Sequence, residues 1–95
     1  MILLHLDRLQ AFSMNHPDAE TPLAAWRQCM ENADFDHFPQ LKGTFGTADY
    51  VRPYTVFNIS GNKYRLVSVI SYHLKAASVE CVLTHQEYDK GKWKK

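Results

Sequence analysis

The chain has 95 residues, of which 45% are hydrophobic and 13% aromatic, so one folded domain spanning residues 1–95 is expected rather than a disordered chain. No apolar run approaches the roughly 20 residues of a membrane-spanning helix, and the start of the chain lacks a signal-peptide pattern. Cys29 and Cys81 stand far apart without a CxxC motif, which predicts reduced thiols in a cytoplasmic protein.

The net charge of +1 hides a difference between the two halves of the chain. Residues 1–49 carry three Lys or Arg against seven Asp or Glu, a net −4, whereas residues 50–95 carry eight against three, a net +5. Such an asymmetry indicates an anionic partner for the C-terminal half. The alternative is a charged tail without a partner, since residues 90–95 supply half of these basic side chains.

The N-terminal half predicts a short strand and two helices. Residues 2–4 are an apolar run that could form an edge strand, and residues 6–15 carry apolar side chains at helical spacing. A histidine–proline pair ends this helix, because the residue before proline is pushed out of the α region. A second amphipathic helix extends to about Asn32, with Asp18 or Thr21 as its N-cap.

The middle of the chain is mixed. Aromatic and apolar side chains recur every three or four residues between positions 34 and 46, which fits a short helical turn limited by glycines. Residues 50–51 and 55–59 resemble strands, and Pro53 confines this region to a sheet edge or a bulge.

Residues 55–71 give the clearest local signal, because two β-rich runs flank a Gly61-Asn62 pair that is typical of hairpin turns. In the second run one face is mostly apolar, and the opposite face begins with Lys63 and Arg65. These cations could form the wall of an anion-binding site. Alternatively, they only keep an exposed hairpin in solution.

A third β run is expected over residues 78–84, with Val79, Cys81 and Leu83 on one face, followed by a helical turn or coil over residues 85–89 and a basic tail. The elements together predict an α+β fold in which two N-terminal helices pack on a three- to four-stranded antiparallel sheet.

The C-terminal half also holds the residues best suited to chemistry. Arg65 can grip a phosphate through two hydrogen bonds, and Lys63 offers a point charge. Histidine is the side-chain type best suited to proton transfer near neutral pH, which makes His85 a candidate, and Tyr88 and Trp93 provide stacking faces. This set suits the phosphates and unpaired bases of single-stranded RNA, although each residue alone could be structural. The sequence has no P-loop, dinucleotide-binding fingerprint or metal-ligand cluster.

Three segments closely resemble the HigB family of toxins from type II toxin–antitoxin systems. They are FGTAD at residues 45–49, TVFNISGNKYRLV at 55–67 and VLTHQEYDKGKWK at 82–94. The helical half is similar to the same family at Arg8-Leu9, Phe12, His16-Pro-Asp18, Pro22-Leu23 and Trp26.

The resemblance implies a RelE-like fold and an mRNA interferase, an endoribonuclease that cuts mRNA, commonly on the ribosome. In such enzymes the RNA 2′-hydroxyl attacks the adjacent phosphate without a metal or other cofactor, and the protein positions the RNA and stabilises charge. A helix-turn-helix antitoxin of the HigA type is the implied partner. Arg65, His85 and Tyr88 are the expected catalytic residues, with the acid and base roles left open. The expected RNA-binding residues are Asn58, Lys63, Lys90, Lys92 and Trp93.

The sequence departs from the family pattern at one place. Family members usually carry Tyr-Ile-Arg ahead of the Leu-Thr-His segment, and here this place reads Ser78-Val79-Glu80. If the usual arginine grips phosphate, Glu80 repels the substrate; if that arginine is structural, Glu80 could pair with Arg65 or a lysine. This departure leaves one alternative open, a family member without catalysis that binds an antitoxin or RNA. Without the resemblance, a small basic nucleic-acid-binding domain is a further alternative.

Overall fold

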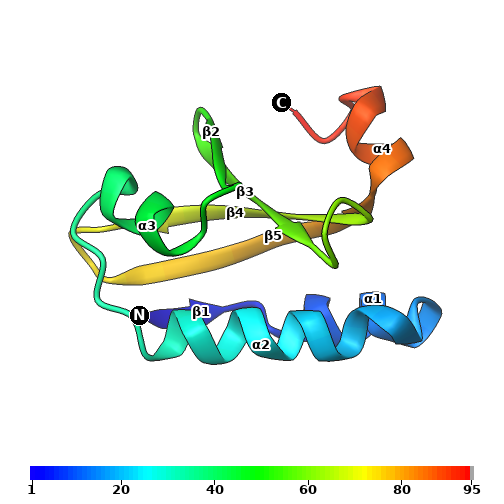
Figure 1. Cartoon of the computed structure of the whole chain (residues 1–95), viewed down its shortest axis with the longest axis horizontal. Helices are drawn as coiled ribbons and strands as arrows, with labels where there is room; N and C mark the ends of the chain where they lie inside the picture. Colours follow the sequence, from blue (N-terminus) through cyan, green and yellow to red (C-terminus); the bar gives the residue numbers. More distant parts are fainter. Residues whose placement is uncertain (95) are drawn as a thin grey trace.

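The computed structural model describes residues 1–94 and shows an α+β fold built on one sheet (Figure 1). Two helices lie along one face of the sheet, and a short helix with the C-terminal segment lies at the other face. The strands are β1 (Ile2–Leu4), β2 (Asp49–Val51), β3 (Tyr54–Ile59), β4 (Tyr64–Ser71) and β5 (Ala76–Thr84). The helices are α1 (Asp7–Asn15), α2 (Glu20–Glu31), α3 (Phe38–Thr44) and α4 (His85–Lys90), with a 3-10 turn η1 (Pro17–Ala19) before α2.

The α+β class and the two N-terminal helices are confirmed, but the sheet has five strands and is mixed. The strand order is β1-β5-β4-β3-β2, and β1 pairs parallel with β5, with Ile2 opposite Ala76. The prediction of an edge strand at residues 2–4 is therefore confirmed. The predicted number of strands, three to four and all antiparallel, was too low. A three-residue run is too short to show a period of two, and its partner lies far along the chain, so local patterns could not reveal this pairing.

The hairpin predicted around Gly61-Asn62 is confirmed. Strands β3 and β4 pair antiparallel, with Asn58 opposite Arg65. Gly61 has a φ of 67°, a left-handed conformation that glycine adopts without steric strain. Successive residues of a strand face opposite sides of the sheet, and because Tyr64 and Leu66 belong to the core, Arg65 faces away from α1 and α2.

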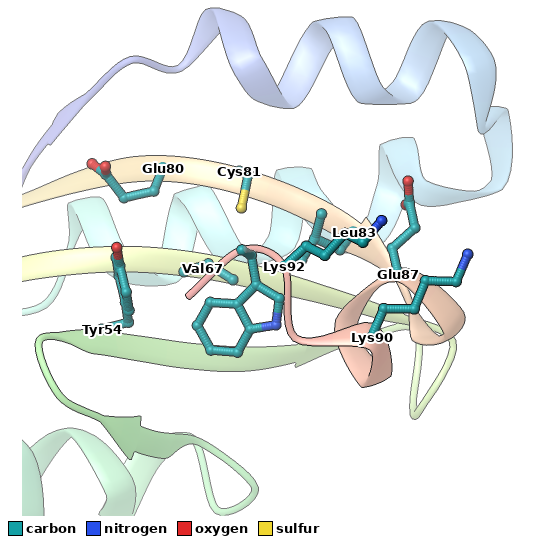
Figure 2. A pocket seen from close by; sticks show the side chains of 9 residues that line it. Tyr54, Val67, Glu80, Cys81, Leu83, Glu87, Lys90 and Lys92 are labelled. Atoms are coloured by element: carbon teal, nitrogen blue, oxygen red, sulfur yellow. The ribbon is translucent and has the colours of Figure 1, made fainter. Parts of the chain in front are cut away.

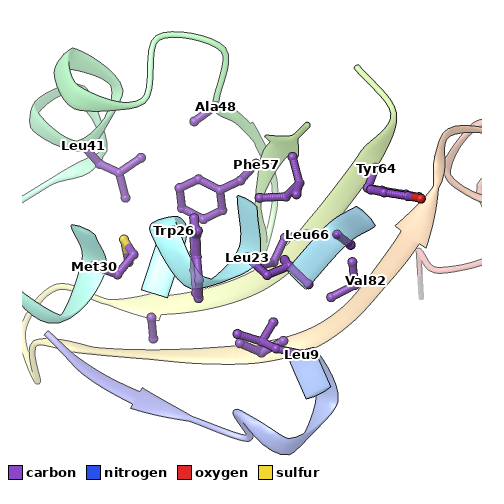
Figure 3. Close-up of a cluster of buried hydrophobic side chains, with 14 of the residues drawn as sticks. Leu9, Leu23, Trp26, Met30, Leu41, Ala48, Phe57, Tyr64, Leu66 and Val82 are labelled. Carbon is purple, nitrogen blue, oxygen red and sulfur yellow. The ribbon is translucent and has the colours of Figure 1, made fainter. Parts of the chain in front are cut away.

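The hydrophobic core lies between the sheet and helices α1 and α2 (Figure 3). Leu9, Leu23, Trp26 and Met30 from these helices are all buried, and the Trp26 ring meets Phe57 of β3 edge-on at 5.4 Å between centroids. Burying each such side chain contributes about 1.5–3 kcal/mol, so the core holds the helical layer firmly on the sheet. Within residues 1–94 no helix is both long and apolar enough to cross a membrane.

The predicted N-cap of the second helix is wrong. Helix α2 begins at Glu20, after η1, and neither Asp18 nor Thr21 caps it, since its N-cap is Ala19 without a side-chain hydrogen bond. Instead, the Asp18 carboxylate accepts a hydrogen bond of 2.6 Å from the Tyr64 hydroxyl and pairs with Lys63. A charged tertiary partner is stronger than a local cap, so Asp18 joins the helical layer to the hairpin.

Strand β5 contains a β-bulge. Val67 of β4 lies opposite Cys81, but the next residue, Ser68, lies opposite Val79, so Glu80 is the extra residue. The bulge shifts the alternation by one position. Val79 faces the core while Cys81 lines a pocket on the other face, so the prediction that these residues share a face is wrong.

Candidate functional site

The candidate site lies on the face of the sheet opposite α1 and α2, around Arg65. This arginine is on β4, a central strand, with Asn58 of β3 on one side and Leu83 of β5 on the other. The residue is only 8% exposed. Its Nη1 atom donates to the backbone oxygens of Asn62 at 3.0 Å and Tyr64 at 3.2 Å, and Nη2 donates to the side-chain oxygen of Asn62. The hairpin turn therefore holds the guanidinium in place.

Helix α4 brings two more of the predicted catalytic residues to Arg65. The Arg65 Nη2 atom lies 3.3 Å from His85 Nδ1, and the Arg65 Cζ atom lies 5.3 Å from the centre of the Tyr88 ring. His85 and Tyr88 are three residues apart, which places them on one face of a helix. Thus Arg65, His85 and Tyr88, predicted separately from the sequence, form one cluster.

The start of α4 is fixed by a capping box. The Thr84 hydroxyl accepts a hydrogen bond from the Glu87 amide at 3.2 Å, and the Glu87 carboxylate accepts one from the Thr84 amide at 2.9 Å. These two hydrogen bonds give partners to two backbone amides, at the point where β5 ends and α4 begins. Because His85 is the first residue of α4, the capping box sets its direction relative to the sheet.

The contacts of His85 favour one tautomer of the neutral ring. A guanidinium only donates hydrogen bonds, so the contact with Arg65 uses the lone pair of His85 Nδ1. The neutral ring then carries its proton on Nε2, which lies 3.3 Å from the Asp89 carboxylate. In this tautomer His85 presents the acceptor atom Nδ1 to Arg65, and Asp89 orients the ring through its other nitrogen, Nε2.

The electrostatics of the cluster favour an anion at Arg65 and a neutral phenol at Tyr88. Within residues 1–94, every recorded partner of the guanidinium is neutral: two carbonyls, an amide oxygen, an imidazole and an aromatic ring. Burial raises the pKa of the Tyr88 hydroxyl above its ordinary value, and the nearby charge of Asp49 acts in the same direction. Tyr88 therefore keeps its proton at neutral pH.

The predicted RNA-binding residues divide into two groups. Asn58 lies directly across from Arg65, and the Trp93 ring stacks on Tyr88 with 5.0 Å between centroids. Lys63, however, pairs with Asp18, and the expectation that Lys63 and Arg65 share a face is wrong. Lys63 belongs to the turn before β4, so strand alternation does not fix the direction of its side chain.

A pocket of about 550 Å³ lies on the same face beside the cluster (Figure 2). Its lining consists of Tyr54, Val67, Glu80, Cys81, Leu83, Glu87, Lys90, Lys92 and Trp93. Lys90, Lys92 and Trp93 were predicted to bind RNA, and the structure gathers all three here. The Cys81 thiol has a raised pKa, caused mainly by burial and secondly by the charge of Glu80, so it lines the pocket as a neutral group.

Sequence reasoning missed three site residues. The sequence predicts Asn62 only as a turn residue and gives Tyr54 no role, and it relates Asp89 to His85 only within an incomplete set of metal ligands. The spacing of four residues between His85 and Asp89 within one helix is a usable sequence signal. The role of Asn62 has no such signal, because it depends on the turn conformation that brings its carbonyl groups to Arg65.

The glutamate that departs from the family pattern is not paired with Arg65. The Glu80 carboxylate accepts a hydrogen bond of 2.9 Å from the Ser78 hydroxyl. The expected pairing with Arg65 or a lysine is absent from the ion pairs recorded over residues 1–94. The charge of Arg65 is thus left available to another anion.

Comparison with known proteins connects this site to a family. A family model, HigB_toxin, described as the RelE-like toxic component of a toxin–antitoxin system, matches residues 19–91, which include the whole cluster. Similar curated proteins are "mRNA interferase toxin HigB" of Escherichia coli K12 and "mRNA interferase HigB" of Shigella flexneri. Each is 28% identical over 92 residues, which cover 94% of this chain and 88% of the relative. The chain therefore belongs to the HigB family of RelE-like toxins, as its three sequence segments predicted.

Proposed function

We propose that this chain is an mRNA interferase that cleaves single-stranded RNA without a metal ion and so inhibits translation. The names of its relatives, which are mRNA interferases, support RNA cleavage. The observation that carries the proposal is the nearly buried Arg65, which has only neutral recorded partners and lies against His85 and Tyr88. A buried charge without a counter-ion is costly, and a substrate phosphate would relieve this cost.

In the proposed reaction Arg65 binds the scissile phosphate. The guanidinium exchanges its contact with His85 for charge-assisted hydrogen bonds to phosphate oxygens and keeps its hydrogen bonds to Asn62. As the 2′-oxygen attacks phosphorus, negative charge on these oxygens grows, and a fixed cation stabilises the transition state more than the bound substrate.

The proton transfers are assigned to His85 and Tyr88. When Arg65 turns to the phosphate, the lone pair of His85 Nδ1 is released and accepts the proton of the 2′-hydroxyl. The bond between phosphorus and the 5′-oxygen breaks, and this oxygen takes the proton of the neutral Tyr88 hydroxyl. The products are a 2′,3′-cyclic phosphate and a 5′-hydroxyl end, and the enzyme is restored when His85 releases its proton to solvent and Tyr88 takes one up.

We further infer that the substrate is mRNA on the ribosome, which places the action in the cytoplasm, and that a HigA-type helix-turn-helix antitoxin neutralises the toxin. Membership of a toxin–antitoxin family supports the existence of an antitoxin. The basic residues Lys90, Lys92 and Lys94 near the site support a large polyanion as substrate.

An alternative function is an inactive family member that only binds its antitoxin or RNA. The reason to consider it is that Glu80 stands where family members usually carry an arginine. The contact of Glu80 with Ser78, rather than Arg65, favours the active toxin, because the phosphate-binding charge is not neutralised.

Arg65→Ala tests the proposed function. Loss of a charged donor that acts in the transition state costs about 3 kcal/mol, so RNA cleavage should fall roughly a hundredfold or more, and growth arrest on expression should be relieved. Purified variants are compared in RNA cleavage with EDTA present and in thermal melts. Arg27→Ala, which removes an exposed arginine of α2, is the control. A folded Arg65→Ala protein that cuts RNA at the parent rate would exclude the assignment, and a harmless parent protein would favour the inactive alternative.

A further inference from the structure

The β-bulge in β5 presents a fixed carboxylate to the pocket. Arg8 of α1 donates to the backbone oxygens of Val79 at 2.9 Å and Glu80 at 3.0 Å, so the bulge is held from the helical side. On the other side the Glu80 carboxylate lines the pocket and accepts a hydrogen bond from Ser78. The backbone of the bulge is thus held by Arg8 and the Glu80 carboxylate by Ser78, on the same face as the proposed RNA-cleavage site.

The rest of the pocket suits a flat aromatic ligand joined to a phosphate. Tyr54 and Trp93 line it as an edge-to-face pair, with 5.5 Å between ring centroids and an angle of 67°, so a base would stack against this pair and not between the two rings. In Figure 2, Glu80 and the Tyr54 hydroxyl lie toward one end of the pocket, and Glu87 and Lys90 lie toward the other. Aromatic walls stack on bases, and an ammonium group binds phosphate.

The chemistry of a carboxylate distinguishes among the four bases. It offers two adjacent acceptors and no donor when ionised. The base-pairing edge of guanine presents two adjacent donors, N1–H and the N2 amino group. Adenine and cytosine each place an acceptor beside their single amino group, and uracil flanks its N3–H with two carbonyl oxygens. Only guanine can therefore satisfy both oxygens of one carboxylate.

We propose that this pocket binds a guanine base of the RNA, with Glu80 accepting hydrogen bonds from N1–H and the N2 amino group. The Tyr54 hydroxyl can donate to guanine O6 at the same end of the pocket. This inference rests on the proposed function and adds a base preference to it. Glu80 is three residues along β5 from Leu83, the partner of Arg65, which is roughly 10 Å, so the guanine belongs to a nucleotide close to the scissile phosphate.

Nucleotide binding tests the pocket separately from catalysis. GMP, IMP and AMP are titrated into the protein by calorimetry, because all three share the phosphate and ribose, and IMP lacks only the 2-amino group of GMP. We expect GMP to bind about tenfold more tightly than IMP, which loses one hydrogen bond to a charged acceptor, and at least about tenfold more tightly than AMP, which loses both. Equal affinities for the three nucleotides in the parent protein would overturn the proposal without the need for any variant.

Glu80→Gln supplies the matched substitution. The amide keeps one acceptor and replaces the other by a donor, so the preference for GMP over IMP and AMP should fall at least about tenfold. Glu31→Gln, the same change on the exposed face of α2, should leave the preference unchanged. A Glu80→Gln protein that retains the full preference for GMP would also overturn the proposal.

Cleavage mapping separates this inference from the proposed function. On an RNA of random sequence the parent protein should cut next to guanine at a fixed offset, and Glu80→Gln should lose this bias. RNA cleavage without a guanine bias would refute the pocket assignment and leave the interferase intact. A preference for GMP without any RNA cleavage would refute the interferase and leave the pocket assignment intact.

Discussion

Arg65 is the only buried charged residue in the described part of the chain, since the other buried polar side chains are Thr55 and Ser68. Strand alternation in the sequence predicted the correct face for Arg65, but it did not predict that the residue is buried. The burial results from Asn62, which wraps the guanidinium with a backbone and a side-chain oxygen, and from the Tyr88 ring beside it. These neighbours orient the charge without neutralising it, which is what a phosphate-binding arginine requires.

Substitution of Asn62 tests this difference between orientation and neutralisation. Asn62→Ala removes one acceptor, so RNA cleavage should fall roughly tenfold as Arg65 loses its fixed direction. Asn62→Asp keeps the acceptor and adds a negative charge that competes with the phosphate, so its loss should be larger, about a hundredfold. Cleavage rates are measured for both variants beside Asn15→Asp, an exposed change at the end of α1. If Asn62→Asp is more active than Asn62→Ala, orientation matters more than free charge.

At the scale of elements, hairpins and helices were predicted well, and irregular features were not. The Gly61-Asn62 pair carries a local signal for a turn, and the spacing of Leu23, Trp26 and Met30 carries one for a helix. The bulge at Glu80 has no local signal, because it depends on how β4 and β5 pair. The Asp18 cap failed for a related reason, since Lys63 and Tyr64 reach Asp18 only after the hairpin packs on the helices.

Thr84→Ala tests whether α4 must be capped for the site to form. Loss of an N-cap hydroxyl costs about 1 kcal/mol, and in a helix of six residues this cost falls on the first turn, which carries His85. Cleavage should therefore decrease severalfold while the melting temperature changes little, because α4 adds no buried residue to the core. Faster amide exchange in α4 would accompany the change. Thr47→Ala, at an exposed turn, is the control, and unaltered cleavage by Thr84→Ala would show that β5 alone positions His85.

At the scale of the whole molecule, a charged contact at Asp18 joins the helical layer to the hairpin that carries Arg65. Hydrogen bonds from Lys63 and Tyr64 lower the pKa of the Asp18 carboxyl below its ordinary value. A carboxyl whose pKa is lowered by folding stabilises the protein above its unfolded pKa, and this stabilisation is lost as the pH falls through the folded pKa. The contact should therefore be intact at neutral pH and disappear in acid.

Asp18→Asn should lower the melting temperature at pH 7, and its difference from the parent should shrink as the pH falls below about 4. At such pH the protonated Asp18 of the parent and the amide of the variant are both uncharged, so neither forms an ion pair with Lys63 and the two melting temperatures converge. Thermal melts between pH 7 and pH 2 measure the effect, with Asp7→Asn on α1 as a variant of equal charge. A difference that does not depend on pH would show that Asp18 acts through packing and not through its charge.

The parallel pairing of β1 with β5 has a consequence for the order of folding. The β3–β4 hairpin closes a turn of a few residues, whereas β1 must find a partner some 70 residues away. Loop-closure entropy grows with the logarithm of loop length, so the second event costs about 2–3 kcal/mol more than the first. Strand β1 also has only three residues with which to recover that cost. The hairpin that holds Arg65 is therefore suited to nucleate folding, and β1 is the strand that docks last and detaches first.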